Sequence, residues 1–350
     1  MRSTKLFFLL VFLFAQNIWA QEKYNFKKIS ANDSLLIIKG ASNLISNKDS
    51  IIINRFSTGF LDKAKDCVSS NNAHTQSGVI IQFKTLSPVI KLNFSARADA
   101  SNRELIFAVY KNKNFVSYYK SLSFELFNQE TDKEANWEIV LPFFYGVHFK
   151  GISIIHGYSL QKTENENLMN YLVIGDSITH GVGQKGVASD GTYPFILAQQ
   201  KNWYLFNVAV SGSKITDLIA DETKDFKADV ISILWGYNDW NNGISMLAVA
   251  EKYKMLISKL RRYHPLAKIY CIMPTFTTSV MPKQPGQNYG IDVLRSTQRK
   301  IVQEFIAKGD QNLKLIEGGE ITSLSDLKDY VHMNNEGAKR FSATLHPLIN

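Results

Sequence analysis

Cysteine is scarce in this chain of 350 residues, which contains only Cys67 and Cys271. Two cysteines cannot build the disulfide framework of a small secreted scaffold. They fall in parts of the chain with different patterning, so a bridge between them stays open but is not favoured. The cysteines and histidines do not show the spacing of a zinc site, and we expect neither a metal nor a cofactor.

Basic clusters are also few, although Lys and Arg number 40 against 31 Asp and Glu, a formal net charge of +9. No Lys/Arg stripe of the kind that follows a phosphate backbone is present, so we do not expect nucleic-acid binding. Hydrophobic residues make up 45% of the chain and charged residues 20%, which excludes general disorder. The length exceeds what one core usually supports and favours two domains.

The pronounced apolar run lies at the N-terminus, from Leu6 to Ala15, after Arg2 and Lys5. It is too short to span a bilayer comfortably, and small Ala20 stands where a signal peptidase would cut. We therefore expect residues 1–20 to be a cleaved signal peptide of bacterial type and the mature protein to be secreted or periplasmic. After cleavage no stable membrane insertion is expected. An uncleaved membrane anchor is the alternative.

Residues 21–160 show short β-type runs in which apolar and polar residues alternate, separated by turn-forming pairs. Repeated short strands without a helical period predict an all-β sandwich of jelly-roll type. The expected strands are 50–55, 78–83, 89–96, 104–110, 115–120, 137–141 and 147–155. A polar, charged segment, 161–167, is expected to link this domain to the next.

From residue 168 to residue 350 strands and helices alternate, which predicts an α/β domain with a parallel sheet covered on both faces. Ligands bind at the carboxyl ends of the strands in such sheets. The expected strands are 171–175, 203–210, 229–236, 268–274 and 313–317, and the expected helices 192–201, 244–263, 291–308 and 335–346.

Four short blocks carry candidate chemistry. Ser177 follows the first parallel strand, and a serine hydroxyl needs a base to become a nucleophile. His332 precedes the last helix with Asp329 three residues before it, a spacing that lets the carboxylate hold one ring nitrogen. Gly212 and Asn238 each follow a strand and offer N–H donors that, with the Ser177 N–H, could hold an oxyanion. Taken singly, each residue also fits an ordinary turn, cap or surface position.

Jointly, these blocks resemble the SGNH (GDSL-type) hydrolase superfamily, over roughly residues 168–350. The matching residues are Gly175-Asp176-Ser177, Gly212, Gly236-x-Asn238-Asp239 and Asp329-x-x-His332. Met333 departs from the pattern, because the family often has proline after the histidine. The resemblance implies a three-layer, flavodoxin-like fold, a Ser177–His332–Asp329 triad and an oxyanion hole of Ser177, Gly212 and Asn238.

The two-domain arrangement is similar to that of the carbohydrate esterase family 2 deacetylases, an analogy of architecture rather than of motifs. It implies an exported O-acylesterase acting on acetylated oligo- or polysaccharides. Asp176, His180 and Trp240 are candidate substrate-binding residues. Gln184, Lys185, Ser189 and Asp190, in the Gly-rich loop that follows the nucleophile, also suit sugar hydroxyls.

Two other functions stay open at this point. One is a lipid esterase or lysophospholipase of the same superfamily, and the other is a carbohydrate-binding protein without catalysis. The glycan, the acyl position, the role of the N-terminal domain and the oligomeric state do not follow from the sequence.

Overall fold

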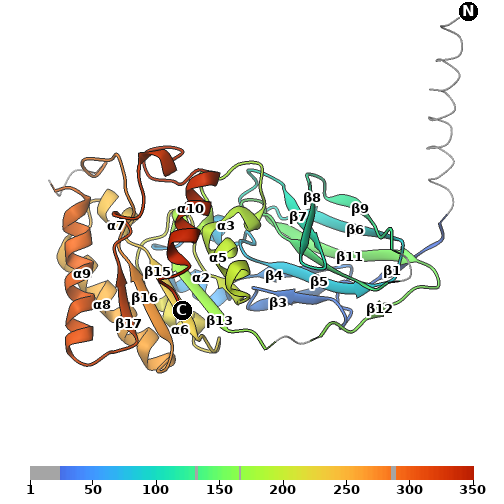
Figure 1. Cartoon of the computed structure of the whole chain (residues 1–350), viewed down its shortest axis with the longest axis horizontal. Coiled ribbons are helices and arrows are strands. Elements are labelled where there is room, and N and C mark those ends of the chain that lie inside the picture. Colours follow the sequence, from blue (N-terminus) through green and yellow to red (C-terminus); the bar gives the residue numbers. More distant parts are fainter. Residues whose placement is uncertain (1–23, 131–132, 165–166, 285–288) are drawn as a thin grey trace, which may run out of the picture.

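The computed structural model describes residues 24–130, 133–164, 167–284 and 289–350. The expected signal peptide, residues 1–20, lies outside this range. The described chain contains two antiparallel sheets, formed by strands from the first half, and one parallel sheet, formed by strands from the second (Figure 1). Strand β12 ends at Gln161 and strand β13 begins at Asn170, on either side of the segment expected to be a linker.

The first half is a sandwich of two antiparallel sheets, as the alternating runs predicted. In β6 the side chains of Ile90, Leu92 and Phe94 are buried while Lys91 and Asn93 point outward, the pattern of a strand with one face on a core. One sheet has the order β3-β4-β11-β6-β9 with β1 beside β11, and the other β12-β5-β10-β7-β8 with β2 beside β5. The strands are β1 Phe26–Ile29, β2 Ile37–Lys39, β3 Asn43–Asn47, β4 Ser50–Asn54, β5 Ile80–Thr85, β6 Val89–Ala96, β7 Phe107–Lys111, β8 Asn114–Tyr119, β9 Ser123–Phe127, β10 Ala135–Val140, β11 Val147–Ile155 and β12 Leu160–Gln161.

Two short helices interrupt this half, which differs from the all-β expectation. They are α2 (Thr58–Lys63) and α3 (Ser70–Ala73), between β4 and β5. Their apolar side chains, such as Phe60, Leu61 and Ala73, belong to the hydrophobic core of the second half rather than to that of the sandwich. The segment was missed because its apolar residues pack against a distant part of the chain and show no extended helical period.

The second half has a five-stranded parallel sheet in the order β14-β13-β15-β16-β17. This order places the second strand beside the first and the remaining strands on the other side, the flavodoxin-like arrangement. Side chains from Tyr171 to Ile174 on the first strand are all buried, because helices cover both faces of the sheet. The strands are β13 Asn170–Gly175, β14 Tyr204–Asn207, β15 Val230–Leu234, β16 Lys268–Ile272 and β17 Leu313–Ile316.

Helices complete the three layers. α5 packs against α10 on the side toward the sandwich, and α8 packs against α9 on the opposite side (Figure 1). Asn334 caps α10 by accepting the Gly337 N–H at 2.7 Å, and Pro194 lies in the first turn of α5. The helices are α4 Ser177–His180, α5 Tyr193–Lys201, α6 Leu218–Thr223, α7 Tyr237–Asn241, α8 Met246–Tyr263, α9 Ile291–Ala307 and α10 Asn335–Leu345, with 3-10 turns at Ser189–Gly191 and Leu324–Asp326.

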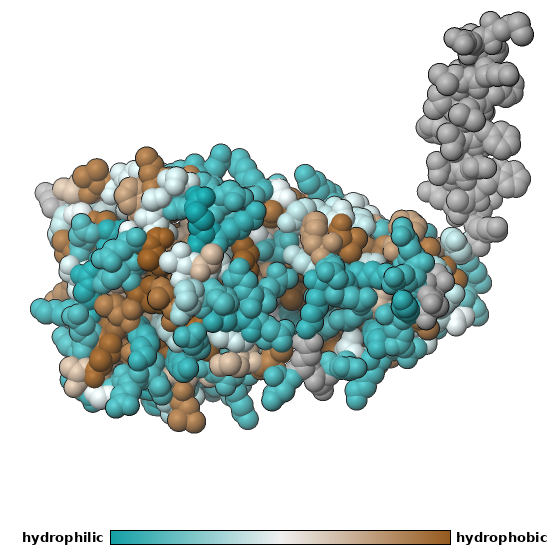
Figure 2. Space-filling model, viewed as in Figure 1, coloured by the Kyte–Doolittle hydropathy of each residue, from teal (hydrophilic) through white to brown (hydrophobic). Residues whose placement is uncertain are grey.

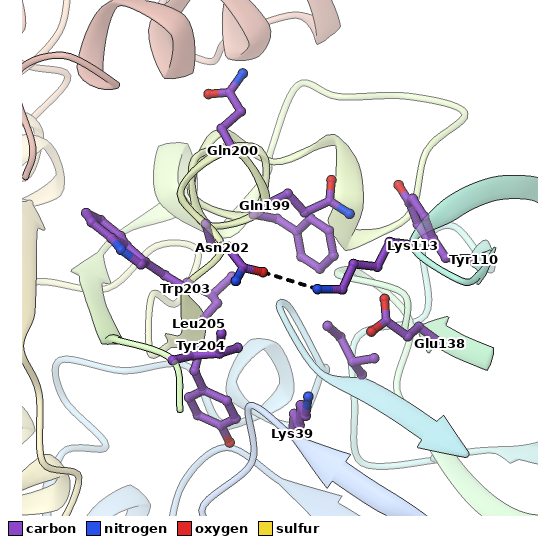
Figure 3. A pocket seen from close by; sticks show the side chains of 14 residues that line it. Lys39, Tyr110, Lys113, Glu138, Gln199, Gln200, Asn202, Trp203, Tyr204 and Leu205 are labelled. Atoms are coloured by element: carbon purple, nitrogen blue, oxygen red, sulfur yellow. Dashed lines mark hydrogen bonds between the residues drawn. The ribbon is translucent and has the colours of Figure 1, made fainter. Parts of the chain in front are cut away.

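Between the halves, at the end of α5, lies a cavity of about 400 Å³ (Figure 3). Trp203, Tyr204 and Gln199 line it from the second half, and Tyr110 and Lys113 line it from the sandwich. It does not include Ser177, Asp329 or His332. Hydrophilic residues cover most of the face in Figure 2, with apolar residues in smaller groups between them. In the described ranges, no helix has the length and hydrophobicity needed to cross a membrane.

Candidate active site

Ser177 lies at the carboxyl end of β13, as predicted, and opens helix α4. The backbone before it is closely packed, and a Cβ on Gly175 would collide with the Thr179 side chain and the Leu234 carbonyl. Glycine is the residue that permits this close approach. Asp176 caps the short helix through its carboxylate, which accepts the Ile178 N–H at 3.2 Å. Together these contacts hold the Ser177 hydroxyl at the edge of the sheet, where the residue keeps 7% of its surface exposed.

His332 and Asp329 come from the loop that precedes α10 and reach Ser177 across 155 residues of sequence. His332 Nε2 lies 2.9 Å from Ser177 Oγ, and His332 Nδ1 lies 2.8 Å from Asp329 Oδ2. The other carboxylate oxygen, Oδ1, accepts the backbone N–H groups of Val331 at 2.9 Å and His332 at 2.8 Å. The three side chains therefore form one hydrogen-bonded chain from carboxylate to hydroxyl.

The pKa of Asp329 lies below its ordinary value. Burial raises it, but the hydrogen bonds from the backbone of His332 and Val331 and from the His332 ring outweigh burial and lower it. The carboxylate is thus ionised at neutral pH. An ionised carboxylate against Nδ1 favours the tautomer that carries its proton there and leaves Nε2 free to accept one.

Gly212 and Asn238 follow the strands on either side of β13. Gly212 has φ +80° and nothing within 4 Å of the place a Cβ would take. Within the described part of the chain its N–H has no hydrogen-bond partner. The Asn238 amide donates one hydrogen to Ser213 O at 2.9 Å, and its second amide hydrogen has no acceptor among the described residues. Strands β14 and β15 lie on opposite sides of β13, so Gly212 and Asn238 follow the carboxyl ends of strands at the point where the strand order reverses. Open α/β sheets bind ligands at such a point.

Three candidate substrate-binding residues need correction, because the structure buries them. Asp176 caps α4. His180 stacks on Phe144 with ring centroids 4.5 Å apart, and its Nε2 lies 2.7 Å from Phe143 O. The Trp240 indole is buried and donates to Tyr289 O at 3.0 Å. Each side chain is enclosed by protein, so none offers its surface to a substrate.

In the polar loop after the nucleophile, Lys185 is exposed, but the other three side chains are oriented differently from the expectation. Gln184 is buried and donates to Met333 O at 2.7 Å, Ser189 donates to Leu141 O at 2.6 Å, and Asp190 accepts from Tyr110 at 3.0 Å. These side chains join the loop to the sandwich and to the His332 segment. They support the site rather than face a sugar.

Burial raises the pKa values of two carboxyl groups near the nucleophile, those of Asp176 and Asp239. The pKa of Asp176 rises to about 7, mainly because the carboxyl is buried and partly because Asp239 lies nearby; the Ile178 N–H opposes the rise. Burial likewise raises the pKa of Asp239 to about 6, against the hydrogen bond from the Ile215 N–H and the charge of Lys252. Asp176 is therefore partly protonated at neutral pH.

Tyr330 also lies beside the site, inside the Asp329-x-x-His332 block, although no sequence pattern singled it out. Tyr330 is 37% exposed, and the centroid of its ring lies 6.3 Å from that of the His332 ring. Lys283 Nζ lies 4.6 Å from the ring centroid and 3.2 Å from the hydroxyl. The position of an aromatic residue between Asp329 and His332 is the sequence signal that could have indicated it.

Cys67 and Cys271 are both free thiols, and Cys271 is buried. The two cysteines do not form a disulfide bridge. Among the described residues, no group of three His, Cys, Asp or Glu side chains could hold a metal ion.

Residues 173–340 match the model of the GDSL-like Lipase/Acylhydrolase family. This match confirms the resemblance drawn from the four blocks. No curated protein sequence matches the chain significantly.

Solved structures resemble the chain over both halves. A salicylyl-acyltransferase from a tetracycline biosynthetic pathway has a TM-score of 0.78 at 17% identity, over 91% of this chain and 95% of that one. A family two carbohydrate esterase from Clostridium thermocellum, in complex with cellohexaose, has 0.66 at 17% identity, over 89% and 99%. An acetyl xylan esterase from the rumen bacterium Butyrivibrio proteoclasticus has 0.64 at 14%, over 93% and 98%. At such identities the likeness establishes the fold, and it confirms the predicted fold class.

Proposed function

We propose that this protein is an exported serine esterase that removes O-acetyl groups from carbohydrates. The observation that carries the proposal is the hydrogen-bonded chain from Asp329 through His332 to Ser177, at 2.8 Å and 2.9 Å. A carboxylate, an imidazole and a hydroxyl in this order form the arrangement that activates a serine.

In the proposed mechanism, Ser177 Oγ attacks the ester carbonyl while His332 Nε2 takes its proton. The developing oxyanion accepts hydrogen bonds from the N–H groups of Ser177 and Gly212 and from the Asn238 amide. His332 then gives its proton to the departing sugar oxygen, which leaves an acetyl group on Ser177. Water, deprotonated by His332, attacks that ester, and acetate leaves as Ser177 regains its proton.

Two observations support a carbohydrate substrate. The likeness to carbohydrate esterases extends over the sandwich as well as the α/β half, 89% of this chain in one case. Tyr330 presents a partly exposed ring next to His332, with Lys283 beside its hydroxyl. An aromatic face with a polar rim suits a sugar ring better than an acyl chain. Arg2, Lys5 and the apolar run after them support export.

The test is an acyl-chain series of chromogenic esters from acetyl to octanoyl, with Ser177→Ala as the control, followed by acetate release from acetylated glycans. We expect kcat/KM to fall steeply with chain length and acetate release to need Ser177. Better hydrolysis of octanoyl esters would favour a lipid esterase or lysophospholipase. Glycan binding without hydrolysis by the wild type would favour a non-catalytic binding protein.

A further inference from the structure

The loop that carries Gly212 is held by residues of the first half of the chain. Arg55 Nη1 donates to Asn207 O at 2.9 Å and to Ala209 O at 2.8 Å. The Lys214 N–H donates to Cys67 O at 2.9 Å on the far side of Gly212. Residues 207–214 thus follow a path that the segment between β4 and β5 determines.

The peptide bond between Ser211 and Gly212 is held by a side chain of the first half. Asn72, on α3, donates from its side-chain amide to Ser211 O at 3.0 Å. Because a trans peptide is planar, its C=O and N–H point in opposite directions, so a fixed Ser211 carbonyl also fixes the direction of the Gly212 N–H. The Ser211 N–H, in turn, donates to His180 Nδ1 at 2.9 Å. Both sides of Ser211 are therefore held.

Asn72 is itself held in place. Its backbone carbonyl accepts from Thr75 Oγ1 at 2.8 Å and from Arg55 Nη2 at 3.3 Å. The Arg55 side chain is buried, and its hydrogen bonds to described residues all end on backbone carbonyl oxygens. The Arg55 guanidinium therefore binds both the backbone of Asn72 and the segment 207–214, and holds the two in a fixed position relative to each other.

Hydrogen bonds join the two halves at several places. At the cavity shown in Figure 3, Lys113 Nζ donates to Asn202 Oδ1 at 3.5 Å, and the hydroxyl of Tyr110 donates to Asp190 at 3.0 Å. Beside Gly212, the donors from the first half end on backbone carbonyl oxygens of residues 207–211. The contacts near α3 therefore fix the backbone of the segment that carries Gly212.

We infer that Asn72 is a positioning residue for the oxyanion hole: its amide aims the Gly212 N–H at the reacting carbonyl oxygen. The first half of the chain thereby completes the catalytic machinery of the second. This inference rests on the proposed esterase function.

The test compares Asn72→Asp and Asn72→Ala with Asn71→Asp in the full-length protein. Asn72→Asp keeps the size of the side chain but places a carboxylate oxygen against the Ser211 carbonyl, where the two acceptors repel. Asn71→Asp adds the same charge one residue away, at an exposed position of the same helix. Measured quantities are kcat and KM for a chromogenic acetate ester, and the rate at which p-nitrophenyl methylphosphonate modifies Ser177. In that reaction Ser177 Oγ bonds to phosphorus, p-nitrophenolate leaves, and the phosphoryl oxygen takes the oxyanion position.

We expect Asn72→Asp to lower kcat by about 10-fold to 10²-fold, as misplacements of about 1 Å do, with KM within about twofold. Phosphonylation should slow in parallel. Asn72→Ala should show a smaller loss, and Asn71→Asp should match the wild type. An unchanged kcat in folded Asn72 variants, or an equal loss in Asn71→Asp, overturns the inference while leaving the esterase proposal intact. A wild-type protein that neither cleaves esters nor becomes phosphonylated at Ser177 overturns both.

Discussion

Replacing Asp329 with asparagine tests the proposed acid–base chain more sharply than removing the side chain altogether. Asp329 Oδ1 accepts two backbone N–H groups, at 2.8 Å and 2.9 Å, while Oδ2 faces His332 Nδ1 at 2.8 Å. In Asp329→Asn the carbonyl oxygen must stay toward the two N–H donors, so the amide NH₂ faces Nδ1. The imidazole then carries its proton on Nε2, where it cannot accept one from Ser177.

The size of the effect follows from two contributions. Loss of the carboxylate removes an attraction to the imidazolium of about 4 kcal/mol at a separation of ~4 Å and an effective dielectric constant of ~20. The Asp329 side chain is 40% exposed, which reduces this to about 2 kcal/mol, or ~30-fold in kcat. Asp329→Ala should show this loss alone. Asp329→Asn should add the wrong tautomer and reach ~10³-fold to 10⁴-fold.

The assay is kcat for a chromogenic acetate ester, with circular dichroism and thermal melting to confirm that both variants fold. The informative quantity is the order of activity, in which the alanine variant should exceed the asparagine variant by about 10-fold or more. Equal activities, or a more active asparagine variant, would refute the view that Asp329 sets the tautomer of His332.

Other perturbations follow from the same geometry. Ser177→Ala should lower turnover by at least ~10³-fold with folding retained, checked by ester hydrolysis and thermal melting; near-normal turnover would exclude a serine nucleophile. Asn238→Ala should lower kcat by ~10²-fold to 10³-fold with little change in KM, because its free amide hydrogen acts on the transition state; an effect on KM alone would make Asn238 a binding residue. Asp176 has its pKa raised to about 7 in the folded protein from 3.8, so its contribution to the free energy of unfolding should decline as pH rises from about 4 to 7. Urea titrations across this range should show a smaller decline for Asp176→Asn, and identical pH profiles would contradict the assigned burial. Preincubation with EDTA should leave the rate unchanged, because the proposed mechanism uses only side chains and water.

Much of the fold could be predicted from local patterns. The sequence predicts a strand over 89–96, and β6 spans Val89–Ala96. The prediction was possible because the side chains of a half-buried strand alternate between core and surface, which gives apolar residues a period of two. The expected helix 335–346 closely matches α10, which ends at Leu345. Helices α2 and α3 were not predicted, since their apolar residues pack against the distant parallel sheet.

Ser177, Gly212 and Asn238 could be proposed as neighbours from the sequence for a similar reason. Each follows a strand of one parallel sheet, and the carboxyl ends of parallel strands share an edge whatever the details of packing. Burial was harder to predict. His180 and Trp240 are polar aromatics beside the nucleophile and the Asn238 block, yet both are enclosed by neighbours from remote segments.

The sequence by itself therefore determined the two kinds of domain, the order of the elements and the residues that carry the proposed chemistry, because these leave local periods and short motifs. Only the tertiary structure decided which side chains face substrate and which support the site. Asn72 and Ser211 are 139 residues apart, and no local pattern marks an asparagine whose partner is a single distant carbonyl. Such contacts depend on how the two halves pack, which is decided by the sum of many buried side chains.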